Sequence, residues 1–526
     1  MQLNFKEDMK LKNWILRIIA LVLVLMTFAS LAVACNDKPS NEDPKDTTEG
    51  EKNDSGEDSD VDPDDPPVVV GDGLPEMDMM GYEFNILCRE NVMFLQEAIA
   101  DDGTGDQVKQ AIYDRNFFVE EEYDCYITAN GVTEADEGTL TRTWNLSITS
   151  GESIYKMGLA HMMYTGTEAL NGTMLDLKTL PYVNMDKPYW HKSMQEAIEV
   201  NNKVYFTASD LCTSSIYYTW HMVFNMEDCD ARNIDIYGMV EDGTWTIGNL
   251  WDIVSRCYVD DGDNVVEFEE DYFGFVIHEN TAITNWTFAL EVPVTTNPSA
   301  GQFEVLYGSD RSMKAAELIY DLLFESNNGA IIYKGKEVGA TFDPENVDMK
   351  ITTKFGNGDA LIVATKIFAL ENLRTSEVKY GIVPYPKYDT DQQNYYSHVD
   401  GRASLLFVPY TLPEAETEYV GLLLEALSAA TAEHVNPVIQ KAALLGRYSE
   451  DSKAYQMLQD TLAGRTYAFA YVYDQASSTK PYWLYQSMMA SRSDNFTDFW
   501  KSKARVADRD FKAIVKKLAN LHTTKK

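Results

Sequence analysis

Strand-like and helix-like segments alternate along the first folded part of the chain. Apolar residues predict a strand at 82–88, and apolar positions at helical spacing predict a helix at 105–123. A short strand at 125–128, a helix around Trp144 and a strand at 154–159 continue the alternation. This pattern favours a parallel sheet with right-handed crossovers, in which ligands bind beyond the carboxyl ends of the strands.

Similar patterns predict the elements of the remaining chain. Thr246 is expected to cap a helix that buries Leu250 and Val254, and Ser449 is expected to cap a late helix that ends at Gly464. Other predicted elements are strands at 201–210, 216–225, 272–278 and 395–408, a helix at 312–325, and a strand, a helix and a strand within 354–389.

An apolar stretch at 14–35 follows three lysines and ends in small residues before Cys35. These features are typical of a secretory signal with a lipoprotein-like cleavage site. We therefore expect residues 1–34 to be removed and Cys35 to carry a lipid on the outer face of the cell membrane. The alternative is an uncleaved signal anchor, because Arg17 lies inside the stretch and Ala32 stands where leucine is more frequent.

The segment that follows, 36–67, is dominated by Asp, Glu, Ser and Pro and has almost no apolar residue. Such a composition cannot bury enough surface to fold. We expect 35–80 to form a flexible tether with a root-mean-square span of roughly 30 Å between its ends. A low-complexity tail without a role would have the same composition.

The composition narrows the classes of function. The formal net charge of −39 disfavours nucleic acid and other polyanions as partners. No second apolar run of membrane-spanning length follows the first, so the mature chain is expected to be soluble. Beyond Cys35 there are five cysteines at no metal-ligand spacing, which permits one disulfide but no disulfide scaffold.

Catalytic and metal-binding motifs are missing from the sequence. It contains no HExxH, GxSxG, P-loop or CxxC motif, and its seven histidines are scattered, so we predict no cofactor and no metal. The acidic run at 260–271 lacks the glycine of a calcium loop, and a solvated turn is the preferred interpretation. With 83 acidic residues the sequence leaves open a glycosidase pair of carboxylates, although no motif supports one.

Aromatic residues are the positive signal, at 12% of the chain. Aromatic rings stack on the apolar faces of sugars while polar side chains bind the hydroxyl groups. Most large aromatic residues in a protein of this size belong to the core, and the exceptions are expected in loops at strand ends. The candidate ligand-binding residues chosen on this basis are Tyr164, Trp190, Trp220, His221, Trp286 and Trp483.

Several stretches resemble the extracellular solute-binding proteins of ABC importers, carbohydrate-type family 1, in their lipid-anchored form. The stretches occur in the family's order along nearly the whole mature chain, at 105–124, 201–225, 244–246, 355–362, 380–397 and 425–429. The resemblance implies an α/β type II periplasmic-binding-protein fold, with two lobes joined by hinge crossovers around a central cleft. It places lobe one at 81–210 and 340–400, and lobe two at 215–335 and 403–520.

Ligand-binding positions follow from the same resemblance, because the family's own ligand residues vary too much to be transferred by identity. It implies positions in the loops after strands, at Glu90 and Tyr164, at the first crossover, near Asp210 and Trp220, and at the second crossover. The second-crossover positions are Tyr396 and His398.

The expected function is that of a monomeric binding protein, not an enzyme, that captures a neutral sugar or oligosaccharide for a separate membrane permease. Three alternatives stay open. They are a surface-anchored glycoside hydrolase, a binding protein for a peptide, polyol or other solute, and an adhesion or scaffolding protein, which the lack of sequence repeats disfavours.

Overall fold

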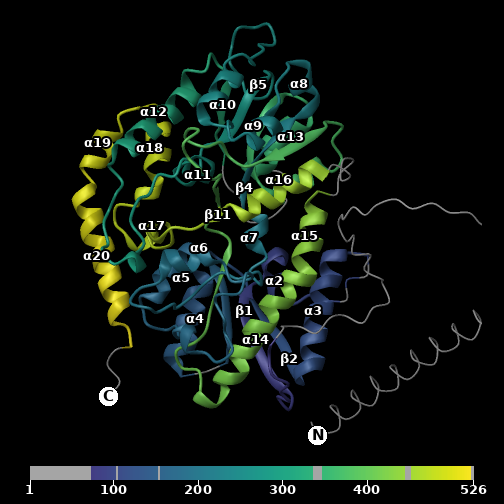
Figure 1. The fold of residues 1–526 in the computed structure, drawn as a ribbon, viewed down its shortest axis with the longest axis vertical. Coiled ribbons are helices and arrows are strands. Elements are labelled where there is room, and N and C mark those ends of the chain that lie inside the picture. The colour runs from purple at the N-terminus through teal and green to yellow at the C-terminus, as the bar shows by residue number, and fades with distance from the viewer. Residues whose placement is uncertain are drawn as a thin grey trace, which may run out of the picture. The chain divides into compact units, whose positions relative to one another are not determined.

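A computed structural model describes residues 73–101, 103, 105–151, 154–335, 346–444 and 452–522. The signal segment, Cys35, most of the tether and Ser449 lie outside these residues. Val68–Lys526 form one compact unit, in which two larger sheets are each covered by helices (Figure 1). Among the described residues, no helix is both long and apolar enough to cross a bilayer.

The first sheet has the strand order β10-β3-β1-β2. Its strands are β1 (Tyr82–Arg89), β2 (Cys125–Val132), β3 (Met157–His161) and β10 (Ser404–Phe407). β1 is parallel to both β2 and β3, whereas β10 runs antiparallel to β3 with Ser404 opposite His161. Gly158 is needed in β3, because a Cβ there would overlap the Phe407 ring of β10.

The second sheet has the strand order β6-β5-β7-β4-β8. Its strands are β4 (Trp220–Asn225), β5 (Phe273–His278), β6 (Ala330–Tyr333), β7 (Ala360–Lys366) and β8 (Tyr380–Val383). β5, β6 and β7 are parallel, and β4 runs antiparallel to both β7 and β8. Every residue of β5 and β7 is buried, as expected for strands covered on both faces.

The two sheets correct the predicted division into lobes. The sequence-based assignment put 340–400 in lobe one, but β7 and β8 belong to the second sheet. It also put the chain from residue 403 onward in lobe two, but β10 belongs to the first sheet. The prediction placed the return to the first lobe at residue 340, whereas strand pairing places it at β10, because pairing depends on partners distant in the sequence.

Helices cover both sheets and continue to the C-terminus (Figure 1). Around the first sheet lie α2 (Val92–Ala98), α3 (Gln107–Tyr123), α4 (Thr139–Ser150), α5 (Met162–Ala169), α6 (Lys192–Ile198) and α14 (Thr417–Ala430). Around the second lie α8 (Met226–Ala231), α9 (Ile236–Glu241), α10 (Ile247–Val254), α11 (Thr281–Ala289), α12 (Asp310–Phe324) and α13 (Val347–Gly356). The others are α7 (Ser214–Tyr217), α15 (Asn436–Ala443), α16 (Ser452–Ala463), α17 (Phe469–Val472), α18 (Leu484–Ala490), α19 (Phe496–Lys501) and α20 (Ala504–Asn520).

Helix caps and apolar patterns agree with the predicted elements over most of the chain. Asp106 caps α3 through hydrogen bonds from two backbone N–H groups, and Thr246 caps α10 as predicted. The expected strand at 201–210 is absent, because this segment makes only isolated bridges, one of them between Thr207 and Leu406 of β10. The helix expected after β7 is a 3-10 helix. The strand expected at 216–225 begins only at Trp220, because the residues before it belong to α7 and to a turn.

The hydrophobic core runs through both lobes, with a second cluster on one face of the second sheet. Val223, Val276 and Val363 from β4, β5 and β7 form the centre of that second cluster. All five described cysteines are buried and free, so the disulfide that the sequence permits does not form among them.

Candidate ligand-binding cleft

The carboxyl ends of the parallel strands carry buried polar residues in both sheets. In the first sheet β1 ends at Arg89 and β3 at His161, beside the start of β10. In the second sheet β5 ends at His278 and β7 at Lys366, and the antiparallel β4 begins opposite Lys366 with Trp220. Each sheet thus places charged and aromatic side chains at one edge, which is where open α/β sheets bind ligands.

The segment between β9 (Ser397–His398) and β10 connects these two edges. The Asp400 carboxylate lies 3.8 Å from Lys366 Nζ of the second sheet. Gly401, next in the chain, accepts a hydrogen bond of 2.9 Å from the Met162 N–H group, directly after β3. The second crossover therefore forms a floor between the two sheet edges.

A cavity of about 480 Å³ opens at the edge of the first sheet. Its walls come from the ends of β1, β2 and β3, the start of α2, the loop after β2, and Arg402 just before β10. The lining residues are Arg89, Glu90, Asn91, Phe94, Val132, Thr133, Glu134, Asp136, Glu137, His161 and Arg402. Residues of both charge signs thus meet in one hollow at strand ends.

Arg89 is fully buried at the base of this cavity. Its guanidinium donates a hydrogen bond of 2.8 Å to Ser404 Oγ and lies 3.2 Å from the centre of the Phe94 ring. Burial lowers the pKa of Arg89 and raises that of the neighbouring Glu97, although their mutual attraction opposes both shifts. Glu97 accepts hydrogen bonds from Ser214 N–H, at 2.9 Å, and from the Ser404 hydroxyl. The buried charges at the base therefore compensate each other.

The rim of the cavity carries a second charged pair. Arg402 lies 3.1 Å from the Glu137 carboxylate, which is also 3.9 Å from His161 Nε2. Burial and the two neighbouring arginines hold the pKa of His161 well below its ordinary value, so its imidazole is neutral at neutral pH. Glu90 accepts a hydrogen bond from the Thr133 hydroxyl and keeps carboxylate acceptor capacity toward the cavity.

Lys366 organises the edge of the second sheet. It is only 2% exposed, its Nζ lies 3.1 Å from Asp348, and it is 4.8 Å from the centre of the Trp220 ring. Burial alone would raise the pKa of Asp348, but the positive charge of Lys366 and contact with His278 outweigh it and hold this pKa at about 2. The Asp400 pKa is lowered in the same way. Both carboxylates are thus ionised at neutral pH.

Four of the ten predicted ligand-binding residues lie at these edges. Glu90 lines the cavity, and Tyr164 packs edge-on against His161 with 5.3 Å between ring centres. Trp220 belongs to the Lys366 cluster. His398 lies beside Asp400, and burial lowers its pKa to about 3.

The other six lie elsewhere. Trp190 is buried and donates to Glu425 at 2.9 Å, Trp286 is buried against Tyr385, and Trp483 packs half-buried against the core. His221 is buried within β4, and burial lowers its pKa to about 4. Asp210 lies 3.1 Å from His191 Nε2, and Tyr396 lines a different cavity of about 600 Å³. Single-sequence reasoning could not separate core indoles from cleft indoles, because both types follow apolar runs.

Sequence reasoning also missed the charged residues that define the cleft, above all Arg89, Lys366, Asp400 and Arg402. A usable signal was present, because Arg89 and Lys366 are the cations that end the apolar strands β1 and β7. A charge at the carboxyl end of a buried strand is costly unless it has partners, and such partners gather at the sheet edge.

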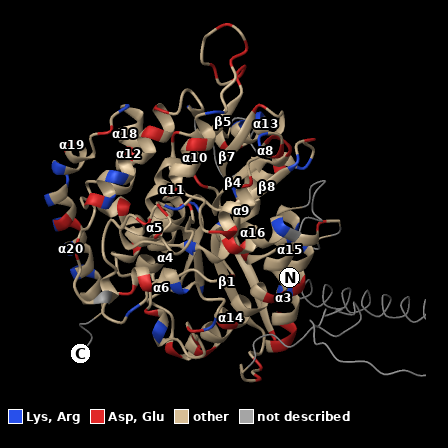
Figure 2. Cartoon of the chain, turned by 45° about the horizontal axis from the view of Figure 1, so that its top comes forward, with Lys and Arg blue, Asp and Glu red and all other residues tan. Residues whose placement is uncertain are grey.

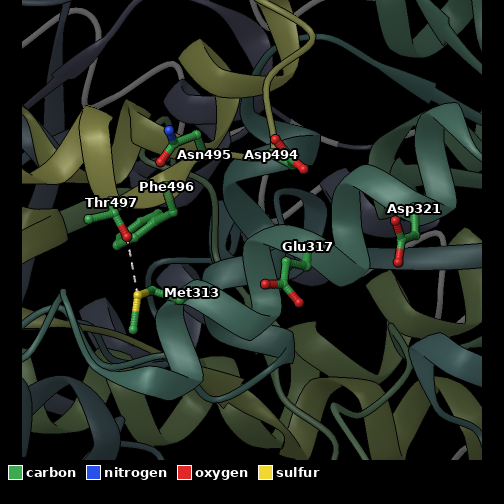
Figure 3. A pocket seen from close by; sticks show the side chains of 7 residues that line it. All are labelled: Met313, Glu317, Asp321, Asp494, Asn495, Phe496 and Thr497. Atoms are coloured by element: carbon green, nitrogen blue, oxygen red, sulfur yellow. Dashed lines mark hydrogen bonds between the residues drawn. The ribbon is translucent and has the colours of Figure 1, made fainter.

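Two other groups of carboxylates lie outside the cleft. Glu317, Asp321 and Asp494 line a hollow of about 460 Å³ between α12 and the segment before α19, where Thr497 donates to Met313 Sδ at 3.3 Å (Figure 3). Asp260, Asp261 and Asp271 offer oxygens within 4.8 Å of one another in the acidic loop. Asp271 already accepts hydrogen bonds from Tyr258 and from backbone N–H groups, which agrees with the predicted turn.

Comparisons with known proteins agree on the architecture. No family model matches the chain, and no curated protein matches its sequence. A cyclo/maltodextrin-binding protein solved with maltotetraose has a TM-score of 0.50 at 11% identity, covering 86% of this chain and 100% of that chain. The GacH receptor of Streptomyces glaucescens GLA.O, solved unliganded and with acarbose, has a TM-score of 0.50 at 9% identity, covering 83% and 99%.

The chain has the two-lobed fold of the solute-binding proteins. This confirms the fold class expected from the sequence. At such low identity the likeness establishes the architecture and not the ligand, which has to be argued from the cleft.

Proposed function

We propose that the protein is the lipid-anchored substrate-binding subunit of an ABC importer and that it captures a neutral sugar or oligosaccharide. The main support for this proposal is the cavity at the carboxyl ends of β1, β2 and β3, where carboxylates already compensate the cations. Arg89 is balanced by Glu97, Arg402 by Glu137, and Lys366 of the facing edge by Asp348.

The charges of the lining argue against an anionic ligand. An anionic ligand would have to displace an internal carboxylate, and Glu90, Glu134 and Asp136 add further negative charge to the lining. Hydroxyl groups suit the site better, since carboxylates accept from them and arginines donate to them without a change in net charge. Phe94 of the lining, and Tyr164 in contact with the lining residue His161, are the nearby aromatic rings for the apolar face of a sugar.

The fold supports capture and release. The chain passes between the lobes after β3, returns before β10, and passes again in the C-terminal helices, so closure requires rotation about a few connecting segments. Solute-binding proteins with this fold pass their ligand to a separate membrane permease, and we assign the same role here. The chain is proposed to act without catalysis.

A thermal-shift panel of plant, host and microbial oligosaccharides tests this proposal. The full-length protein is kept in a sugar-free zwitterionic detergent, because sugar headgroups would compete. A ligand at about 100 times its Kd should stabilise the fold by roughly 2.7 kcal/mol. No shift with any oligosaccharide in the panel would refute it.

A matched pair of variants localises the site. Glu90→Gln removes a carboxylate directly after β1 and should weaken binding of the identified glycan at least tenfold by calorimetry. Glu83→Gln makes the same change on an exposed residue at the opposite end of β1 and should leave the affinity unchanged. Equal effects of the two changes would place the ligand elsewhere.

Release of reducing sugar from the glycan during long incubation with the protein would favour the hydrolase alternative instead.

A further inference from the structure

The C-terminal helix α20 has one buried face and one basic face. Ala507, Phe511, Ile514 and Leu518 are buried in the core. The exposed residues on the opposite side include Arg505, Arg509, Lys512 and Lys516, here called the basic stripe. Their spacing of four, three and four residues places these four cations in one line along the helix.

The stripe differs in charge from the rest of the molecule. Residues 501–522 contain seven Lys or Arg and two Asp or Glu, whereas the whole chain contains 44 and 83. The two acidic residues of this segment are partly buried: Asp510 accepts hydrogen bonds from Ser478 and pairs with Arg509 at 2.8 Å, and Asp508 pairs with Lys512 at 2.7 Å. Lys501 and Lys517 extend the exposed positive charge at the ends. Figure 2 shows basic residues along α20, with acidic residues between them.

This arrangement opposes the stability of the isolated helix. Arg505 and Arg509, and likewise Lys512 and Lys516, are like-charged neighbours four residues apart, which repel each other. Asp510 and Asp508 offset part of this repulsion, because they lie 2.8 Å from Arg509 and 2.7 Å from Lys512. Solubility does not require the stripe, since the net charge of −39 already supplies it. An external anionic surface would relieve the repulsion.

The geometry suits a flat partner. α20 is a regular helix, so the stripe from Arg505 to Lys516 extends over roughly 17 Å at 1.5 Å per residue. The helix starts beside α19 and ends where Lys203 donates to Leu521 O at 2.7 Å and Tyr410 stacks on His522. Both ends are held by the folded body, so the cations are presented on a rigid edge and not on a loose tail.

We propose that the basic stripe of α20 docks the folded body onto an anionic membrane surface. Cations at such a surface each strengthen association about fivefold, but only within a screening length of about 8 Å. The lipid expected on Cys35 would keep the body near the membrane, so even weak docking would be populated. The inference concerns the orientation of the body and does not depend on which ligand the cleft binds.

Fluorescence energy transfer between α20 and labelled lipid headgroups measures the distance of α20 from a bilayer. Ala513 is exposed next to Lys512, and an Ala513→Cys substitution accepts a fluorescent donor. Burial raises the pKa of the described cysteines, Cys88 and Cys125 among them to about 12, so they react slowly, and unsubstituted protein controls for background. The full-length chain is reconstituted in lipid nanodiscs with acceptor-labelled headgroups, either zwitterionic or containing phosphatidylglycerol.

Energy transfer should rise in the anionic discs and fall back in 0.5 M salt. The fourfold change Arg505→Gln, Arg509→Gln, Lys512→Gln and Lys516→Gln should lower the ratio of docked to undocked protein at least tenfold. A matched control removes four exposed cations that lie elsewhere and should retain most of the docking. These four control substitutions are Lys192→Gln, Lys314→Gln, Lys379→Gln and Lys453→Gln.

Three outcomes would overturn the proposal. One is equal energy transfer in zwitterionic and anionic discs. Another is an equal loss in the stripe variant and the control, which would mean that only net charge matters. The third is binding of soluble poly(glycerol phosphate) to the stripe without any approach to anionic discs. Glycan-induced thermal shifts of the stripe variant report separately on folding and on the cleft.

Discussion

Replacement of Lys366 by methionine would leave two carboxylates uncompensated inside the protein. Lys366→Met keeps the length and apolar stem of the side chain but removes the charge that lies 3.1 Å from Asp348 and 3.8 Å from Asp400. All three groups are almost fully buried. Loss of one partner from such a buried cluster typically costs about 3–5 kcal/mol. We expect a loss of this size at pH 7, measured as the free energy of unfolding in urea.

The pH dependence sharpens this prediction. In the native protein the Asp348 pKa is lowered from 3.8 to about 2, which stabilises the fold by about 2 kcal/mol above pH 4 and is lost as the pH falls through 2. In the variant, burial without a cation raises the pKa of Asp348 and Asp400, so acid neutralises them and removes the penalty. The stability difference between native and variant protein should therefore be largest at pH 7 and narrow toward pH 4.

A combined variant separates lost charge compensation from lost packing. Adding Asp348→Asn and Asp400→Asn to Lys366→Met removes the uncompensated charges and should restore more than half of the lost stability. The surface change Lys379→Met breaks an exposed pair with Glu227 and should cost less than about 1 kcal/mol. A loss below 1 kcal/mol for Lys366→Met, or a difference that does not vary with pH, would refute the reasoning.

Three further changes test local features. Gly158→Ala would push a methyl group into Phe407 between β3 and β10 and should destabilise the fold by about 1–3 kcal/mol in urea titrations; a neutral effect would show that the strands can separate. Thr246→Ala removes the cap of α10 and should cost about 1 kcal/mol, whereas Thr246→Ser should be near neutral. Burial raises the pKa of Asp474 from 3.8 to about 7, so its ionisation destabilises the fold progressively between pH 4 and 7. Asp474→Asn should therefore flatten the stability profile over this range, and an unchanged profile would contradict the shift.

Most secondary structure follows from local patterns. The strand at 82–88, the helix at 105–123 and the strand at 272–278 were predicted to within a few residues, because their periodicity and capping residues act over one or two turns. The segment 201–210 was predicted as a strand from its β-forming residues, but it makes only isolated bridges, and no neighbouring strand pairs with it over its length.

Site residues were predictable only in part. Glu90 and Tyr164 could be placed at the cleft because the rule that ligands bind at strand ends needs only the order of elements. Trp190 and Trp286 look the same in sequence but fill the core, since burial is decided by which distant helix packs over a residue. The charged pair of Arg402 and Glu137 joins residues far apart in the chain, and no local pattern indicates it.

The sequence by itself thus determined the parallel α/β elements, the loops in which a ligand site had to be sought, and a resemblance whose fold the structure confirmed. Only the tertiary structure decided which sheet β7, β8 and β10 join, because strand pairing depends on partners distant in sequence. It also decided that Lys366, Asp348 and Asp400 form one cluster, since buried charges are tolerated only where folding brings their counterions within a few ångströms.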